Sequence, residues 1–260
     1  MGPLLILVAC AHPPVDPNTR VSRPGAGTIV GVTVRRDTNI ATVHTALDAL
    51  DAWEALYSEW NPTSITSRAA VSPQSLEAEG LDLFEYAGWL HDASGGAFDI
   101  AWRGATWSVE GYQLTVSGRL DLGGLLKGFL ADRTAEHLRE AGLTDFAVDV
   151  GGDVVVHGEA RPGDGGWPVD VAVAGTIRTV TVTHALSTSS QEQQPGHVVD
   201  ARDGRPANAL AGVYVTAPSG LVADGLATAA LASGGVIEPP AGACVYLLGV
   251  DGSEAVRCVE

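Results

Sequence analysis

One lysine stands among fourteen arginines in this chain of 260 residues, and it lies beside two glycines. Lys127 belongs to RLDLGGLLKGF, residues 119–129, where a strand-like segment turns through Gly123 and Gly124 into an expected helix. The free N–H groups at the start of a helix suit a phosphate group. Helix stability does not explain a lysine at this position, because a cation at the start of a helix opposes the helix dipole. Contact with a phosphate oxygen would explain it, because the ammonium is a compact point charge. A glycine turn with a solvated lysine is the alternative interpretation.

Asp224 and Thr228 have the residue types and the spacing of metal ligands. They lie four residues apart in ADGLATAA, so on a helix their side-chain oxygens project from the same face. Carboxylate and hydroxyl groups are hard oxygen ligands that suit Mg²⁺, which completes its octahedron with waters and substrate phosphates. The alternative is that Asp224 caps its helix or faces solvent.

A histidine and a glycine pair supply the other candidates. His197 lies in GHVVDARDGRP, residues 196–206, and an imidazole can act there as a base or an orienting group. Gly151 and Gly152 separate two strand segments, a position where backbone passes close to a neighbour. That neighbour can be a ligand or another strand.

The charge of the chain limits its partners. A formal net charge of −16 argues against a nucleic acid or an anionic membrane, because these partners require a surplus of Lys and Arg. An anionic ligand would need a local positive charge, from a metal or a placed cation, because distant charges are screened beyond ~10 Å.

The elements that must position these side chains predict an α+β fold with a mixed or antiparallel sheet. Strand patterns dominate, and they do not alternate regularly with helices as in a βαβ protein. Residues 1–27 are rich in Pro, Gly and small polar residues after an apolar start, which predicts a tail or linker before one domain, 28–260. Apolar spacing predicts helices over 40–60, from about 72 to 96, from 124 to 141 and over 221–233.

The N-terminus and the cysteines bear on location. The segment MGPLLILVAC resembles the box before a lipidated bacterial cysteine, but its apolar run is short and no Lys or Arg precedes it. We therefore expect a cytoplasmic protein, with an extracytoplasmic lipoprotein anchored through Cys10 as the alternative. No metal-type cysteine spacing is present, and at most Cys244 and Cys258 could pair.

Six sequence elements, in order, resemble the FAD:protein FMN transferase (ApbE-like) family. The resemblance runs from about Gly27 to Gly235. The matching segments are YSEWNPTSITSR, GGAFD, DLGGLLKGFLADR, VDVGGDV, HVVDARDGRP and VADGLATAAL.

The resemblance implies a single compact α+β domain of T-fold-related architecture. It also implies Mg²⁺-dependent cleavage of the FAD pyrophosphate, transfer of FMN to a Thr or Ser hydroxyl of an acceptor protein, and release of AMP. The residues expected to contact the flavin nucleotide are Trp60, Ala97, Phe98, Asp99, Asp121, Lys127 and Val198. The metal is expected on Asp224, Thr228 and a backbone carbonyl near Gly124, and the catalytic candidates are His197 and Lys127.

Five positions depart from the family pattern: Ala26, Trp60, Ala70, Asp149 and Asp203. Trp60 keeps an aromatic face for stacking where the family has a tyrosine, and Asp149 takes the place of an asparagine. Two alternatives to the transferase therefore stay open. One is an FAD pyrophosphatase that passes FMN to water, and the other is a flavin-binding protein without turnover.

Overall fold

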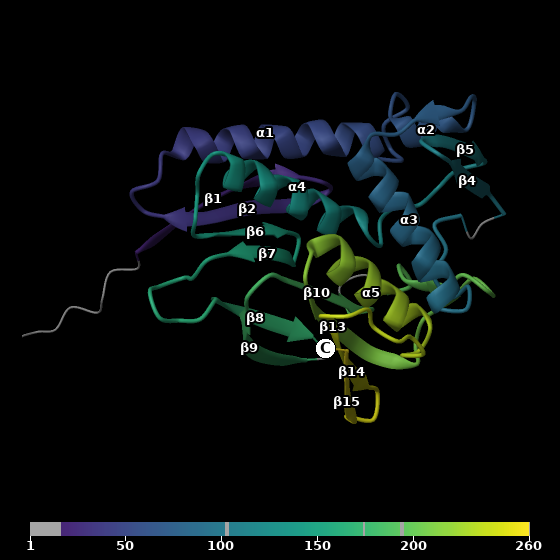
Figure 1. Ribbon diagram of the computed structural model, residues 1–260. Helices are drawn as coiled ribbons and strands as arrows, with labels where there is room; N and C mark the ends of the chain where they lie inside the picture. Colours follow the sequence, from purple (N-terminus) through teal and green to yellow (C-terminus); the bar gives the residue numbers. More distant parts are fainter. Residues whose placement is uncertain (1–16, 102–103, 174, 193–194, 260) are drawn as a thin grey trace, which may run out of the picture.

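Eight strands form one antiparallel sheet in this computed structural model, which describes residues 17–101, 104–173, 175–192 and 195–259 (Figure 1). Every neighbouring pair is antiparallel, so the predicted α+β class is confirmed and its sheet is of the antiparallel kind. Across the sheet the strands are β1 (Asn18–Gly25), β2 (Thr28–Arg35), β6 (Phe146–Val150), β7 (Asp153–His157), β10 (Ala185–Ser190), β13 (Leu210–Ala217), β14 (Cys244–Gly249) and β15 (Glu254–Cys258).

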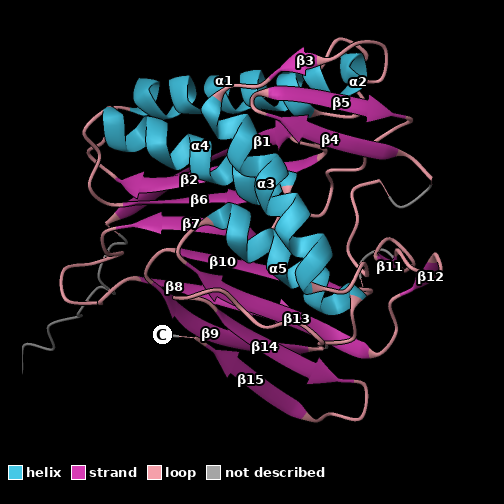
Figure 2. Ribbon diagram, turned by 45° about the vertical axis from the view of Figure 1, so that its right-hand side comes forward, coloured by secondary structure: helices cyan, strands magenta, loops and turns pink. Residues whose placement is uncertain are grey.

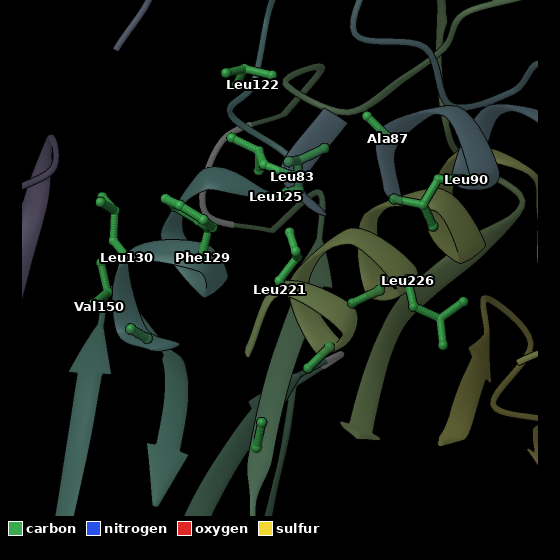
Figure 3. Packing of buried hydrophobic residues seen from close by; sticks show 14 of the residues in the cluster. Leu83, Ala87, Leu90, Leu122, Leu125, Phe129, Leu130, Val150, Leu221 and Leu226 are labelled. Atoms are coloured by element: carbon green, nitrogen blue, oxygen red, sulfur yellow. The ribbon is translucent and has the colours of Figure 1, made fainter. Parts of the chain in front are cut away.

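The main helices gather on one face of this sheet (Figure 2). They are α1 (Ile40–Tyr57), α3 (Ala78–Ala93), α4 (Leu126–Glu140) and α5 (Gly220–Ala232), with the short α2 (Ile65–Ala69) after α1. Figure 3 shows how Leu90, Phe129 and Leu226, from three different helices, contribute to a single core. Burial of these apolar faces is what holds α4 and α5 against the sheet.

A hairpin of β8 (Trp167–Val173) and β9 (Thr176–Val182) covers part of the opposite face. Alternation along β7 shows the two faces directly, because successive side chains of a strand point to opposite sides. Val155 belongs to the core under the helices, whereas Val154 and Val156 pack in a second cluster with the hairpin residue Trp167.

The remaining strands are peripheral. A three-stranded sheet has the order β3 (Gln74–Ser75), β5 (Gln113–Ser117), β4 (Thr106–Glu110), and β11 (Val199–Asp200) pairs with β12 (Arg205–Pro206). Within the ranges that the structure describes, no helix combines the length and the apolar character needed to cross a membrane.

Strand β1 corrects the prediction of a tail over 1–27. Residues 18–25 pair with β2 along their whole length through a two-residue turn, in which Ala26 has φ +50° and Gly27 φ +69°. Such turns normally carry Asn, Asp or Gly at both positions, so an alanine there concealed the hairpin. Residues 1–16, including Cys10, lie outside the described part.

The second helix also begins later than expected. The sequence predicted a start near residue 72, but α3 begins at Ala78 because Gln74–Ser75 pairs with β5 as β3. Cys244 and Cys258 face each other across β14 and β15 and form a disulfide, the one pairing that the sequence left open.

Candidate functional site

A cavity of about 1100 Å³ collects the residues that the sequence analysis singled out. It lies among the hairpin turn after β1, the start of α4, the middle of α5, the turn between β6 and β7, and the segment that follows residue 196. All eleven candidate residues line it: Trp60, Ala97, Phe98, Asp99, Asp121, Gly124, Lys127, His197, Val198, Asp224 and Thr228. The structure thus brings the candidates together, while their individual roles stay predictions.

Helices α4 and α5 approach each other through a glycine contact beside the cavity. A Cβ added to Gly128 would lie 2.1 Å from the Gly220 carbonyl oxygen and 2.7 Å from the Asp224 Cβ. Asp224 is only 2% exposed, and its Oδ2 accepts a hydrogen bond from the Gly128 N–H at 3.0 Å. Ser219 is the N-cap of α5, so Asp224 neither caps the helix nor faces bulk solvent.

The residues around Asp224 fit a Mg²⁺ ion. A Cβ on Gly124 would lie 2.8 Å from the Thr228 Cγ2, so the Gly124 backbone runs directly against Thr228. The Asp224 carboxylate, the Thr228 hydroxyl and a backbone carbonyl near Gly124 are all hard oxygen donors. The described ranges contain no group of three or more His, Cys, Asp or Glu that could hold a metal. A metal here would therefore need the hydroxyl, the carbonyl and oxygens from substrate or water.

Lys127 is held by a buried carboxylate. Its Nζ donates to the Oδ2 of Asp153, whose Oδ1 accepts from the hydroxyl of Ser187. Asp153 is 1% exposed and the Lys127 side chain 33%, so the ammonium is anchored on its protein side and reaches the cavity on the other. The alternative of a freely solvated lysine is therefore wrong.

Electrostatics keep Lys127 charged. Burial by itself lowers the lysine pKa, but the carboxylates of Asp224 and Asp153, together with that of Asp149, raise the Lys127 pKa above its usual value. Burial also raises the pKa of the Asp153 carboxyl, and the nearby Asp224 adds to this effect while Lys127 opposes it. The Lys127 ammonium thus lies among several carboxylates. An anionic ligand would be attracted to this part of the cavity only where it contacts Lys127.

The aromatic side of the cavity is formed by Trp60. The indole is 78% exposed, and the Arg119 guanidinium lies 4.3 Å from its ring centroid. Glu59 fixes this arginine, because its Oε1 lies 3.2 Å from the Arg119 Nη2 while its Oε2 accepts from the Leu122 N–H at 3.1 Å. Burial, and secondarily the charge of Asp121, raises the pKa of Glu59.

Hydrogen bonds donated by backbone N–H groups hold the loops at the cavity. Asp121 accepts from the Gly123 N–H at 3.0 Å, which shapes the turn into α4. The Ala97 carbonyl accepts from the Ala201 N–H at 2.9 Å, which ties the segment of Phe98 and Asp99 to the loop of His197. His197 itself is exposed at the cavity, and Val198 beside it is buried.

Sequence reasoning assigned no role to two carboxylates that support the site. Asp153 holds Lys127, and Asp132 accepts from the N–H groups of Gly220 and Leu221 at 2.7 and 2.8 Å, at the start of α5. Both are acidic residues within the matched segments VDVGGDV and DLGGLLKGFLADR, next to apolar residues. For Asp153 the available signal was a carboxylate directly before the apolar run 154–156, because such a group needs a partner when buried, whereas Asp132, followed by Arg133, carried no comparable signal.

Comparisons with known proteins agree on one family. Residues 26–113 and 106–237 match the profile of the ApbE family. An FAD:protein FMN transferase from Rhodobacter capsulatus is 30% identical over 132 residues, which is 45% of this chain and 24% of that protein. The chain thus spans about a quarter of the length of that curated relative.

Solved structures share the fold. The flavin transferase ApbE from Vibrio cholerae has a TM-score of 0.80 at 22% identity, covering 94% of this chain and 97% of that one. The apo form of the flavinyl transferase ApbE from Pseudomonas stutzeri has a TM-score of 0.76 at 19% identity, covering 94% of both chains. At these identities the likeness establishes the architecture.

Proposed function

Because the chain belongs to the ApbE family, we propose that it transfers FMN from FAD to a Thr or Ser hydroxyl of an acceptor protein, in a Mg²⁺-dependent reaction that releases AMP. The observation that carries the proposal is the meeting of Lys127 with Asp224 and Thr228 in one cavity. Lys127, together with a Mg²⁺ ion held on Asp224 and Thr228, would supply the local positive charge that an anionic pyrophosphate requires in a chain of net charge −16.

The chemistry needs positioning and charge neutralisation more than covalent catalysis. The acceptor hydroxyl oxygen would form a bond to the phosphorus of the FMN half, and the bond from that phosphorus to the bridging oxygen would break, so that AMP leaves. Lys127, anchored on Asp153, would stabilise negative charge on the phosphate oxygens. When bound on Asp224 and Thr228, Mg²⁺ would neutralise further charge on the pyrophosphate.

His197 is our candidate for the acceptor side of the reaction. Its exposed position at the cavity suits a group that receives the proton of a hydroxyl brought in by another protein. Trp60, Phe98 and the backbone near Val198 would contact the flavin nucleotide, with Ala97, Asp99 and Asp121 as further contacts.

One assay separates this function from the alternatives. The protein is incubated with FAD, Mg²⁺ and an acceptor protein bearing the target threonine, and the products are analysed by mass spectrometry. A flavin adduct on the acceptor with AMP release supports the transferase. Free FMN and AMP without an adduct identify an FAD pyrophosphatase, and bound FAD without AMP release identifies a flavin-binding protein.

A separate variant tests the proposal that Asp224 is a Mg²⁺ ligand. Asp224→Ala should abolish Mg²⁺-dependent turnover, because it removes the one charged ligand of the proposed set. Asp251→Ala is the matched control, since that carboxylate accepts from the Ser253 N–H in an exposed turn outside the cavity lining. Full Mg²⁺-dependent activity of Asp224→Ala would show the ligand assignment to be wrong.

For location we propose an oxidising compartment, and the disulfide between Cys244 and Cys258 supports it. This favours the alternative of an extracytoplasmic protein anchored through Cys10 over the cytoplasmic expectation. Mass spectrometry of the N-terminal peptide from the membrane fraction tests it, with lipid on Cys10 as the expected result and an unmodified Met1-containing peptide as the opposite one.

A further inference from the structure

The cavity is lined by far more negative than positive charge. Among the described residues of its lining, Lys127 is the only Lys or Arg. The carboxylates in the lining are those of Glu54, Glu59, Asp99, Asp121, Asp149, Asp170 and Asp224. An anionic ligand would meet repulsion here unless some of these carboxylates are neutralised from outside the cavity.

Asp149 is neutralised by an arginine that reaches across a neighbouring strand. The Arg20 Nη2 on β1 lies 2.7 Å from the Asp149 Oδ2 on β6, and β2 runs between these two strands. The guanidinium passes over Gly31, whose Cβ, if present, would lie 2.4 Å from the Arg20 Nη2. Gly31 is the register partner of Asp149, so the missing side chain opens the direct route between the pair.

The same carboxylate shapes the glycine turn of the cavity. The Asp149 Oδ1 accepts from the Gly152 N–H at 2.8 Å, and both Gly151 and Gly152 line the cavity. These glycines have φ of +64° and +99°, conformations that favour glycine. Asp149 is also close enough to Lys127 to raise the lysine pKa. The charge of Asp149 therefore acts in the part of the cavity where the lone lysine acts.

We propose that Arg20 is a positioning residue for the anionic ligand of the cavity, because it cancels the charge of Asp149 and holds that carboxylate on the Gly151–Gly152 turn. The identity of the ligand, the pyrophosphate of FAD, rests on the proposed function. Strand β1 then belongs to the binding site although Arg20 does not line the cavity.

The pair contributes little to folding, which makes its effect on binding measurable. The side chains of Arg20 and Asp149 are 43% and 27% exposed, and ion pairs of such exposure add only a small free energy of unfolding. Loss of Arg20, in contrast, leaves an uncompensated carboxylate beside a ligand that carries two negative charges.

The test measures the Kd of FAD by quenching of flavin fluorescence, with and without Mg²⁺. Arg20→Ala should weaken binding by about three- to tenfold, the scale of one partly screened charge. Arg20→Lys should restore most of the affinity. Asp149→Asn removes the charge and keeps an oxygen for Gly152, so Arg20→Ala combined with Asp149→Asn should return to within about twofold of wild type.

Arg23→Ala is the matched control. Arg23 lies on the same strand and forms an ion pair of the same 2.7 Å length, but its partner Asp51 does not line the cavity. Its removal changes the net charge equally and should leave the Kd unchanged. The defect of Arg20→Ala should also shrink at high salt, because screening weakens the repulsion.

Two results overturn the inference alone: a wild-type Kd in Arg20→Ala, or a defect of Arg20→Ala that Asp149→Asn does not suppress. The second result would mean that Arg20 acts through the fold and not through the charge of Asp149. A wild-type protein that binds no FAD at all would overturn the proposed function together with this inference.

Discussion

At the scale of single residues, Lys127 differs from the arginines of the chain in how its side chain presents its charge and its hydrogen-bond donors. One nitrogen carries its charge and donates to the buried carboxylate of Asp153. A guanidinium is planar and spreads its donors over a wider fork. The buried carboxylate of Asp153 offers one oxygen to this side chain, which suits the single nitrogen of the ammonium.

Lys127→Arg should therefore keep the positive charge and lose turnover. We expect kcat for FMN transfer to fall about tenfold or more, because the charge moves away from the position fixed by Asp153. Steady-state kinetics measures this, and thermal unfolding checks that the variant is folded. Wild-type kcat in this variant would show that any positive charge suffices.

Tyr57 places a hydroxyl group in the hydrophobic core at the end of α1. Its side chain is fully buried, and its hydroxyl has no hydrogen-bond partner among the residues that the structure describes. Burial, with the charges of Glu77 and Glu79, raises the pKa of Tyr57 to about 12. The hydroxyl lies against Gly80, where an added Cβ would lie 2.1 Å from the oxygen.

Tyr57→Phe should leave the free energy of unfolding unchanged or raise it by about 1–3 kcal/mol, because an unpaired buried hydroxyl is removed. The wild-type protein should also lose stability between pH 10 and about 12, at up to ~1.4 kcal/mol per pH unit. In this window the unfolded tyrosine has released its proton and the folded one retains it. Tyr57→Phe lacks this contribution, so its advantage should grow with pH.

Urea unfolding at neutral and alkaline pH measures both effects. Gly80→Ala is the companion variant, and it should be strongly destabilising in the wild type and less so in Tyr57→Phe, where the clash with the oxygen is gone. A clear loss of stability in Tyr57→Phe at neutral pH would mean that the hydroxyl has a partner.

Candidate site residues could be found from the sequence where the residues concerned lie only a few positions apart in the chain. Asp224 and Thr228 could be placed on one helical face from a four-residue interval, and Lys127 stood out by its type. The partner of Lys127 could not be found in this way. Asp153 lies 26 residues further along the chain, and it reaches the lysine only because β7 lies beneath α4.

At the scale of elements, α5 depends on α4 for its first turn. Asp132 of α4 accepts from two backbone N–H groups of α5, those of Gly220 and Leu221. These N–H groups have no partner within their own helix, since the first turn of a helix leaves its donors free. One carboxylate thus sets the position of the helix that carries Asp224 and Thr228.

Asp132→Ala should lower the free energy of unfolding by about 1–3 kcal/mol and weaken Mg²⁺ binding in the same variant. Calorimetric titration with Mg²⁺ in the presence of FAD, together with urea unfolding, measures the two effects. Ser219→Ala is the control, because it removes only the 3.3 Å cap hydrogen bond from Val222 at the same helix end. Equal Mg²⁺ affinity in Asp132→Ala and wild type would contradict the positioning role.

Element boundaries failed in the sequence analysis for identifiable reasons. The run IRTVTVTHAL, residues 177–186, has the β-branched pattern of a single strand, but β9 ends at Val182 and β10 begins at Ala185. The chain changes from the covering hairpin to the central sheet between them, and a continuous β-branched run contains no signal for a change of layer. Helix α1, in contrast, followed its three- and four-residue periodicity closely.

At the scale of the molecule, the disulfide closes one edge of the central sheet. It joins β14 to β15, the outermost pair beyond β13. Neither strand contributes to the cavity lining. The disulfide should therefore contribute to stability without affecting the site.

Replacing both Cys244 and Cys258 by Ser should lower the free energy of unfolding by about 2–4 kcal/mol, since the crosslink closes a loop of 14 residues. Denaturant unfolding measures this, and wild-type protein treated with a thiol reductant should show the same loss. Transfer activity below the unfolding temperature should be unchanged. Free thiols in the untreated protein would contradict the pairing.

The class of the fold could be predicted from the sequence, and the order of its strands could not. Strand-rich patterns without βαβ alternation indicated α+β, as observed. The pairing of β2 with β6, however, crosses more than a hundred residues and four helices. Contacts of this range depend on the packing of the whole core and are absent from local patterns.

The glycine contact between α4 and α5 has a thermodynamic consequence. Gly128 and Gly220 bring two backbones together so closely that neither helix can slide past the other without a clash. Lys127 directly precedes Gly128 on α4 and Asp224 follows Gly220 on α5, so the separation between the proposed nucleotide-binding cation and the proposed metal ligand is fixed before either ligand arrives. A metal and a nucleotide bound there would meet at a fixed distance, so the attraction between their opposite charges should make binding cooperative, and each should raise the affinity of the other by the same factor.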